Sequence, residues 1–533
     1  MYKMFLTRRA LFSGAVGALV AGPGLGWPAL AAAQESDRLR IGMATPPTTL
    51  DPHFQSNAPN NAIAMHLFDA LVTNDESARP TPCLATSWRS LDDTHWEFIL
   101  RQGVTYSDGA PFLPDDVMAS VERVNSLQSP ASYRTYTRTI KSITAPDPGR
   151  IVIETKAPDP LLPIAMGRIR IISARHKDSP TATYNAGRAV IGTGPYLLKE
   201  FVPGSHLLLA RNEGYWGPKP VWKEALIRMI SDDGARTAGL LSGDLDIIEE
   251  VPFEAVERVA KDQRFHIIRG LSSRIVYFAF DHAREVTPFA TDPDGKPLPR
   301  NPMKDLRVRQ ALSMAINRKA IVAQVMSGNA EVATQYLPKG APGTSPNLEP
   351  IPYDPERAKK LLAEAGYPNG FRLVIHGPND RYINDSKVVQ AVAQMLTRIG
   401  VQTKVEVMPW SVYSARSNNN EFSLNLMSWG VNTGETSNPL IALNSTYDKD
   451  RGTGSSNGGR YSNPALDKTL QVATQTMNDE IRNRLLAEAC EMVFNDCAIM
   501  PLYHEVVQLA ARKSIDYRTR NDQYTLAAGI RKS

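Results

Sequence analysis

The sequence predicts a soluble α/β protein in which strands and helices alternate, with three-layer packing. The chain has 533 residues, of which 42% are hydrophobic and 22% charged, and this composition is typical of a well-cored globular protein. At ~150 residues per domain, this length predicts two to four domains. A short apolar strand pattern at Arg372–Ile375 lies between the helical patterns Pro355–Ala365 and Lys387–Ile399, and such alternation favours the α/β class. No repeat of 20–50 residues is visible, which argues against solenoids and propellers.

Each element follows from local periodicity. Alternating or continuous short apolar runs predict strands at Arg38–Ala44, Trp96–Leu100, Ile151–Thr155, Tyr196–Phe201, His206–Arg211, Leu226–Ile230, Leu245–Ile248, Arg372–Ile375, Gln402–Val407, Phe422–Met427 and Ile499–Tyr503. Apolar residues at helical spacing predict helices at Asp115–Asn125, Asp233–Leu241, Leu306–Ile316, Pro355–Ala365, Lys387–Ile399 and Glu480–Phe494. The segments Pro288–Asn301 and Asn444–Asn463 are rich in Pro, Gly, Ser and Asp, and we expect surface loops there.

The first 33 residues have the three parts of a secretory signal peptide. Lys3, Arg8 and Arg9 form a basic start, an uncharged stretch follows, and Ala31-Ala32-Ala33 is a small-residue cleavage site. The Arg8-Arg9 pair resembles a twin-arginine export signal. The alternative is an uncleaved membrane anchor, because the uncharged stretch is long enough to span a bilayer. Its Gly, Pro and Ala content favours export with cleavage near Ala33.

Charge and cysteine content exclude several classes of partner. The net charge of +5 is too small for a chain built around nucleic-acid phosphates, so no nucleic-acid partner is expected. The three cysteines, Cys83, Cys490 and Cys497, form no CxxC pair, which leaves structural zinc without support. Cys490 and Cys497 are either a disulfide or two buried thiols, and the sequence leaves this open.

The catalytic motifs that occur in the chain are incomplete. Gly454–Gly458 matches the G-x-S-x-G pattern around Ser456, but no hydrophobic strand precedes it, as a nucleophile elbow requires. His504-Glu505 begins a zinc-protease motif whose second histidine is replaced by Gln508. Neither a phosphate-binding P-loop nor a dinucleotide-binding glycine motif is present. We therefore expect no catalytic residue, no metal ligand and no cofactor.

Four sequence blocks, in order along the chain, resemble the family 5 periplasmic solute-binding proteins, the dipeptide, oligopeptide and nickel group of ABC importers. They are Leu84–Val124, with Trp-x-Phe-x-Leu-Arg and Ser107–Phe112; Gly192–Tyr196 with Asn212–Trp216; Asp305–Leu312 with Ala315–Arg318; and Tyr353–Leu362 with Ala365–Tyr367. Together they cover nearly the whole chain after residue 33, which makes the resemblance specific.

The resemblance implies a two-lobed clamshell with an extra subdomain in the first lobe. Lobe I would comprise 34–76, 190–275 and 491–533, with 77–189 as its subdomain, and lobe II would comprise 276–490. The chain would cross between the lobes near Leu271–Tyr277 and near Asp479–Asn495. These crossings would act as the hinge when the lobes close on a ligand.

The resemblance also implies ligand-binding residues. Peptide-binding members carry two tryptophans nineteen residues apart, and Trp410 and Trp429 have that spacing. Three residues after the second tryptophan these members have an Asp that pairs with the ligand's ammonium group, where this chain has Asn432. Because a buried ammonium without a carboxylate is costly, free-amine peptides require Glu435 or Asp385 as a substitute.

Two loops that follow strands are expected to face the cleft. Ligands in open α/β sheets bind at the carboxyl ends of strands, where Gln55–Asn60 and Asn379–Asn384 lie. Arg381 can hold a carboxylate or phosphate in a bidentate fork, and Tyr382 can stack on the ligand. Gln55 is the candidate in the first loop. The alternatives are that the tryptophans belong to the core and that Arg381 is a solvated loop charge.

The resulting hypothesis is a monomeric periplasmic receptor of an ABC import system for peptide transport. It would bind a short peptide or peptide-like polar solute and deliver it to an inner-membrane permease. The alternatives are a secreted hydrolase that uses Ser456 and a receptor for nickel or a metal chelate, since the same family contains nickel receptors.

Overall fold

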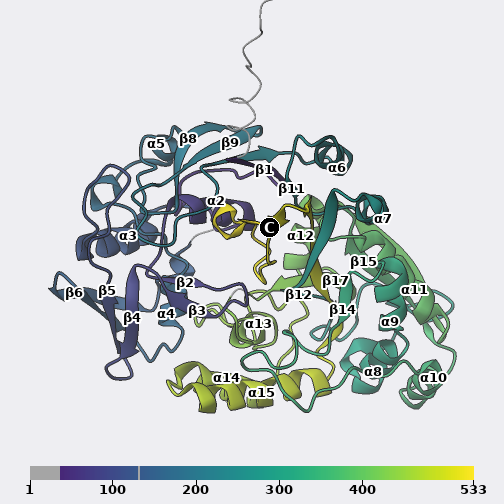
Figure 1. Ribbon diagram of the computed structural model, residues 1–533. Helices are drawn as coiled ribbons and strands as arrows, with labels where there is room; N and C mark the ends of the chain where they lie inside the picture. The colour runs from purple at the N-terminus through teal and green to yellow at the C-terminus, as the bar shows by residue number, and fades with distance from the viewer. Residues whose placement is uncertain (1–36, 130–132, 432) are drawn as a thin grey trace, which may run out of the picture.

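A computed structural model describes residues 37–129, 133–431 and 433–533, and one large mixed sheet runs through it (Figure 1). The predicted signal peptide lies outside these residues. The strand order is β13-β15-β17-β12-β18-β11-β1-β10-β9-β8, with β14 paired to β18 and β16 to β15. The strands are β1 (Arg38–Met43), β8 (Tyr196–Val202), β9 (His206–Arg211), β10 (Glu224–Met229), β11 (Ile247–Ile248), β12 (Phe265–Phe280), β13 (Ala290–Thr291), β14 (Ala330–Val332), β15 (Phe371–Pro378), β16 (Val401–Met408), β17 (Leu424–Gly430) and β18 (Ile499–Arg512).

The two longest strands, β12 and β18, join the two halves of the molecule. They pair antiparallel from Phe265 opposite Arg512 to Ala279 opposite Ile499, with a register shift between Leu271 and Ile275. Their ends belong to different hydrophobic clusters: Ile268, Val507 and Leu509 lie at one core, whereas Phe278 and Met500 lie in another. We call these halves lobe I and lobe II.

Lobe I packs its helices against the end of the sheet formed by β1 and β8–β11. Its helices are α2 (Ala58–Leu67), α5 (Thr181–Asn185), α6 (Asp233–Ser242) and α7 (Phe253–Lys261), and its C-terminal segment carries β19 (Ile515–Asp516) and β20 (Arg531–Lys532). Asn57 precedes helix α2, and its side chain accepts a hydrogen bond from the Asn60 backbone N–H and so caps the first turn. The core combines Leu67 of α2 with strand residues such as Leu39 and Leu207.

A separate antiparallel sheet, β4-β5-β7-β6, lies at the outer side of lobe I (Figure 1). Its elements and neighbours are β2 (Val72–Asn74), β3 (Pro80–Pro82), β4 (Ala85–Ser90), β5 (His95–Leu100), β6 (Ile140–Asp147), β7 (Arg150–Thr155), α3 (Pro114–Ser126) and α4 (Leu162–Met166). Phe98 of β5, Ile153 of β7 and Val117 of α3 share one buried cluster. This sheet therefore has a core of its own within residues 71–171.

Lobe II surrounds the other end of the large sheet with helices. They are α8 (Leu306–Met314), α9 (Arg318–Ala320), α10 (Pro355–Glu364), α11 (Asp385–Thr397), α12 (Trp410–Asn418), α13 (Ser437–Leu443), α14 (Pro464–Gln475) and α15 (Asp479–Asn495). One cluster packs α8, α10 and α11 against β12, β15 and β17. A second packs α13, α14 and α15 against Ile275 and Tyr277 of β12, so that both faces of the sheet are covered.

The predicted α/β class and most of the predicted elements are confirmed, but the second crossing lies elsewhere than expected. The segment Asp479–Asn495 is helix α15, whose residues Cys490 and Val493 are buried within lobe II. Strand β18 makes the crossing instead, between Tyr503 and Val507. Cys83, Cys490 and Cys497 are all buried free thiols, so Cys490 and Cys497 do not form a disulfide.

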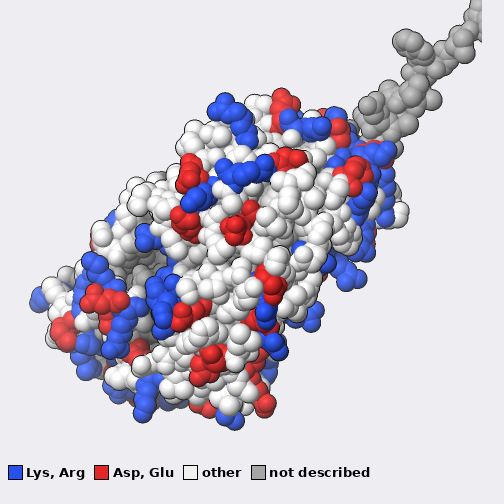
Figure 2. Space-filling view, turned by 90° about the vertical axis from the view of Figure 1, so that its left-hand side faces the viewer, with Lys and Arg blue, Asp and Glu red and all other residues white. Residues whose placement is uncertain are grey.

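The surface carries charges of both signs. On the face shown in Figure 2, basic and acidic side chains are interspersed rather than segregated. In the part of the chain that the structure describes, no helix combines the length and apolar character needed to cross a membrane.

Candidate functional site

Two adjoining cavities lie where the lobes meet. The interlobe cavity, of ≈ 450 Å³, is lined by Thr45, Thr48 and Asn57 of lobe I, by residues of the crossing strands and by the loop after β15. The inner cavity, of ≈ 440 Å³, extends into lobe II. Arg274, Arg381 and Tyr382 line both. The two cavities therefore adjoin at these three residues, and each has the size of a small-ligand site.

Three strand ends converge on the inner cavity. Strand β15 runs parallel to β16 and to β17, so their carboxyl ends lie at the same edge of the sheet. Arg381 and Tyr382 follow β15, Trp410 begins the helix that follows β16, and Trp429 lies at the end of β17. All four side chains line the inner cavity. Strand ends of this kind are where open α/β sheets bind ligands.

Arg381 presents an exposed guanidinium against two aromatic faces. It lies 5.7 Å from the ring centroid of Tyr382 and 5.4 Å from that of Trp410, and these two rings meet edge to face at 6.0 Å. No carboxylate within the described residues forms an ion pair with it. The backbone N–H groups of Arg381 and Tyr382 donate to Asp385 at 3.0 and 3.1 Å, which fixes the loop. The arrangement leaves a positioned cation free for an anionic group.

The second tryptophan is held by its own hydrogen bond. Trp429 Nε1 donates to Asn438 Oδ1 at 2.9 Å, and the half-buried ring packs against the core of lobe II. The ring therefore forms part of the cavity wall and also packs on the core of lobe II.

Neither carboxylate suggested as a substitute at the ammonium position is free. Asp385 accepts the two N–H groups of the Arg381 loop, and Glu435 forms a buried ion pair with Arg482 at 3.1 Å. Asn432 lies outside the described residues. Gln55 does not line either cavity: its Oε1 accepts from the hydroxyl of Thr48 at 2.8 Å, and Thr48 lines the interlobe cavity in its place.

Three glutamates that sequence reasoning did not select line the interlobe cavity: Glu249, Glu250 and Glu505. Desolvation raises the pKa of each, and that of Glu249 to about 7. Glu505 lies 3.5 Å from the Nε of Arg274. The inner cavity, by contrast, is lined by Arg274, Arg381 and Arg460 and by no acidic side chain of the part of the chain that the structure describes. The cleft therefore changes from acidic to basic along its length.

The loop before α14, predicted only as a surface loop, contributes a wall of the inner cavity. Ser455, Ser456, Gly458 and Arg460 line it. The motif around Ser456 lacks the partner that a nucleophile needs, since the Ser456 hydroxyl has no hydrogen-bonded histidine within the described residues. The nearby His282 instead donates to the Ala498 carbonyl at 2.8 Å, and burial lowers its pKa to about 4.

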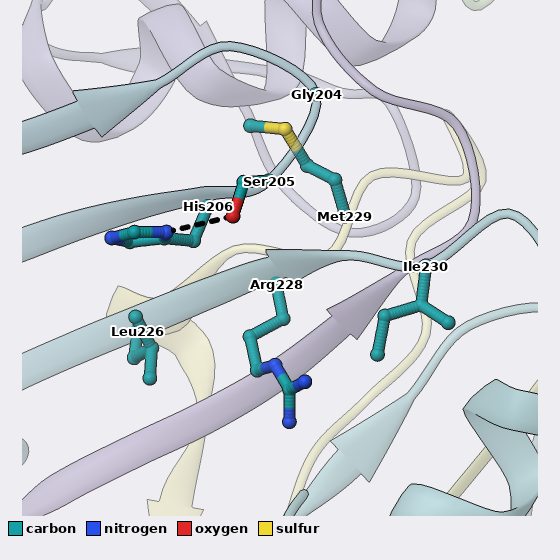
Figure 3. Close-up of a pocket in the computed structure, with 7 residues that line it drawn as sticks. All are labelled: Gly204, Ser205, His206, Leu226, Arg228, Met229 and Ile230. Atoms are coloured by element: carbon teal, nitrogen blue, oxygen red, sulfur yellow. Dashed lines mark hydrogen bonds between the residues drawn. The ribbon is translucent and has the colours of Figure 1, made fainter. Parts of the chain in front are cut away.

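A further pocket, of ≈ 360 Å³, lies away from the cleft at the turn between β8 and β9 (Figure 3). The Ser205 hydroxyl is 3.0 Å from Nδ1 of His206, and Glu200 lies 3.3 Å from Nε2. Figure 3 shows Leu226 and Arg228 of β10 projecting to the same side, as alternate strand residues must, with Ile230 just after the strand on that side too. Ser205 lies in an exposed turn and His206 begins β9 next to it, so the two do not form an enclosed reaction site.

Within residues 37–129, 133–431 and 433–533, no group of three or more His, Cys, Asp or Glu side chains is placed to hold a metal ion.

Most of the chain is similar in sequence and in fold to known binding proteins. Heme-binding protein A of Haemophilus influenzae is 27% identical over 479 residues, which cover 84% of this chain and 83% of that protein. The glutathione-binding protein GsiB of Salmonella typhimurium is 26% identical, covering 88% and 89%. The structure of the periplasmic binding protein DppA of Helicobacter pylori, in complex with the peptide STSA, superposes with a TM-score of 0.74 at 22% identity, covering 94% of this chain and 99% of that one.

These likenesses confirm the predicted two-lobed periplasmic-binding-protein fold. Residues 79–451 match the family described as bacterial extracellular solute-binding proteins, family 5 Middle. This match covers more than half of the chain and includes Trp410 and Trp429. The protein therefore belongs to the family 5 bacterial extracellular solute-binding proteins.

Proposed function

We propose that this protein is the periplasmic substrate-binding component of an ABC import system and that it captures a short peptide or peptide-like solute between its lobes. The observation that carries the proposal is the pair of adjoining cavities between the lobes, where two tryptophans meet Arg381, a cation with no ion pair among the described residues, at three strand ends. Family membership and the relatives named for glutathione and murein peptide binding support it.

The charges of the cleft suit a zwitterionic ligand. Arg381 binds the carboxylate of the ligand through a bidentate fork, and the rings of Tyr382 and Trp410 lie beside its guanidinium. Glu249, Glu250 and Glu505 offer carboxylates at the other cavity for an ammonium group. This polarity compensates for Asn432, which carries no charge of its own.

Ligand capture couples to lobe closure through the two crossing strands. Strands β12 and β18 pass between the lobes, and the irregular register between Leu271 and Ile275 is a point at which backbone angles can change. A ligand that contacts both lobes favours the closed state, because only that state makes both sets of contacts. The permease would then recognise the closed protein.

We further propose export to the periplasm through a twin-arginine-like signal, with cleavage near Ala33, and action as a monomer. The lobe division proposed from the sequence is 34–76, 190–275 and 491–533 for lobe I, 77–189 for its subdomain and 276–490 for lobe II. The buried clusters support moving the last boundary to between Tyr503 and Val507.

A thermal-shift and calorimetric panel tests the function. The protein is unfolded and refolded to remove resident ligand, then mixed with di- to pentapeptides, N-acetylated peptides, amino-acid conjugates, and nickel with and without histidine. A ligand at 100 times its Kd adds ~2.7 kcal/mol of stability. A shift with peptides supports the proposal. A shift with nickel–histidine alone, or with none of these compounds, refutes it.

A further inference from the structure

The inner cavity holds more positive charge than one ligand carboxylate needs. Its three guanidinium groups differ in their surroundings. Arg274 lies near Glu505 and donates to the Ser428 hydroxyl at 3.0 Å. Arg381 and Arg460 form no ion pair with any carboxylate of the described residues. In the proposed function Arg381 binds the carboxylate of the ligand. Arg460 has no part in that contact.

Arg460 is held in place by its surroundings. Its guanidinium lies 3.9 Å from the ring centroid of Tyr447, and Nη1 donates to the Asn457 carbonyl at 3.4 Å. With its amide oxygen turned toward Arg460, Asn420 accepts from Nη2 at 3.1 Å and donates to the Gly458 carbonyl at 2.8 Å. The side chain is thus positioned before any ligand arrives, which lowers the entropic cost of binding.

The backbone that carries Arg460 is equally fixed. The buried Asn457 side chain donates to the carbonyls of Ser445 and Tyr461 and accepts from the Tyr461 N–H. Gly459 lies against the end of β12, where a Cβ atom would stand 2.0 Å from the Phe280 carbonyl oxygen. Arg460 itself has a φ of 56°, a left-handed conformation that is unfavourable for a side chain larger than glycine. A strained residue that is firmly held is typical of a binding site.

The same loop adds neutral donors beside this cation. Ser455 and Ser456 are exposed to the inner cavity, and their hydroxyls form no hydrogen bond with other described side chains or backbone groups. Hydroxyls and a guanidinium together bind a carboxylate well, because each supplies an N–H or O–H donor and the guanidinium also supplies charge.

We propose that Arg460, with Ser455 and Ser456, forms a second anion subsite that selects ligands with an acidic side chain. The inference rests on the proposed function, and it narrows the ligand class to short peptides or conjugates with two carboxylates. One carboxylate binds at Arg381 and the other at Arg460. The serine that resembles a nucleophile is, on this view, a ligand-binding hydroxyl.

Matched peptides test the subsite by isothermal titration calorimetry. Tripeptides with Glu at each position in turn, in an alanine background, are compared with their Gln counterparts. We expect Glu to bind about 10- to 100-fold more tightly than Gln at one position, because a charge-assisted hydrogen bond is gained. Arg460→Met should abolish this preference and leave the affinity for the Gln peptides within about twofold. Arg460→Lys should restore part of it.

Arg451→Met is the control, because Arg451 belongs to the same loop but is exposed and pairs with Asp448 at 3.4 Å, outside the cavity. It should keep the preference for Glu. Equal binding of Glu and Gln peptides at every position, or a preference that survives Arg460→Met, would overturn the subsite while leaving the proposed function intact.

A second measurement does not depend on peptide binding. Glutarate, a free dicarboxylate, should raise the melting temperature of the wild-type protein more than that of Arg460→Met, whereas glutaramide should shift neither. The absence of a difference between the two proteins would refute the subsite. Failure of all peptides combined with a glutarate difference would refute the peptide function and retain the anion subsite.

Discussion

Arg381 offers the sharpest test of how the cleft binds a ligand. We consider Arg381→Met, which keeps much of the aliphatic stem and removes the charge. A charge-assisted hydrogen bond to a carboxylate contributes ~1.5–3 kcal/mol, so a value of ~2 kcal/mol predicts about 30-fold weaker peptide binding. Because the guanidinium is exposed and lies over two rings at 5.4 and 5.7 Å, its removal should lower the free energy of unfolding by no more than about 1 kcal/mol.

The assay is a double-mutant cycle, measured by calorimetry, between Arg381→Met and amidation of the peptide carboxyl terminus. If Arg381 binds that carboxylate, each single change weakens binding and the two together add little, which gives a coupling energy of ~2 kcal/mol. Arg416→Met is a matched control. Arg416 also lies over a ring, that of Phe422 at 4.9 Å, but it pairs with Glu421 at 2.8 Å and does not line the cavities.

The control should change stability by a similar amount and leave affinity unchanged. A coupling energy near zero for Arg381 would refute the assignment of the carboxylate to this residue. Equal loss of affinity in Arg381→Met and Arg416→Met would show that the aromatic wall, rather than the charge, governs binding.

Four further outcomes are expected. Trp429→Ala should weaken ligand binding by ~2–4 kcal/mol and also lower the midpoint of urea unfolding, because the ring packs on the core and donates to Asn438; loss of affinity without loss of stability would contradict the second half. Asn432→Asp should improve calorimetric affinity for free-amine peptides over N-acetylated ones, and no gain would place the ammonium elsewhere. The pKa of Glu249 is raised to about 7 by desolvation, with Glu250 and Arg236 as charged neighbours, so the folded protein holds a proton that the unfolded chain releases. Its contribution to stability is complete below pH ~4.5 and lost as pH rises through about 7; urea unfolding of Glu249→Gln should lack this decline, and identical pH profiles would refute it. Arg482→Met should lower the unfolding free energy by ~3–5 kcal/mol, since it leaves Glu435 buried without its partner; a loss below about 1 kcal/mol would mean that water reaches the carboxylate.

The local sequence is sufficient to predict strands and helices whose hydrophobic periodicity is unbroken. The predicted strand His206–Arg211 coincides with β9, and the predicted helix Asp115–Asn125 differs from α3 by one residue at each end. In both segments the alternation of apolar and polar residues involves only close neighbours in the sequence. The acidic first turn of α3 also marks where that helix starts. Periodicity of this kind requires no knowledge of the partner surface.

Strand β12 shows where local pattern fails. Its residues 270–273 are Gly-Leu-Ser-Ser, which interrupts the apolar period, and yet the strand continues for 16 residues. Pairing with β18 up to Leu271 and again from Ile275 maintains it, and Gly270 permits an approach so close that a Cβ atom would lie 1.7 Å from Thr519 Oγ1. Local pattern also places the second crossing wrongly, at α15 instead of β18. The two elements adjoin in the sequence, and only their packing shows which of them passes between the lobes.

The sequence by itself therefore determined the α/β class, the family resemblance and four residues of the cleft, Arg381, Tyr382, Trp410 and Trp429, because these follow strand ends or a family spacing. Only the tertiary structure decided that Gln55 hydrogen-bonds to Thr48 instead of lining the cleft, that Glu249 faces it, and that Arg460 reaches it from a loop. The positions of Glu249 and Arg460 depend on contacts between segments far apart in the sequence, such as Gly459 against the Phe280 carbonyl. No local period encodes such a contact, since it arises only when the lobes assemble around the shared strands.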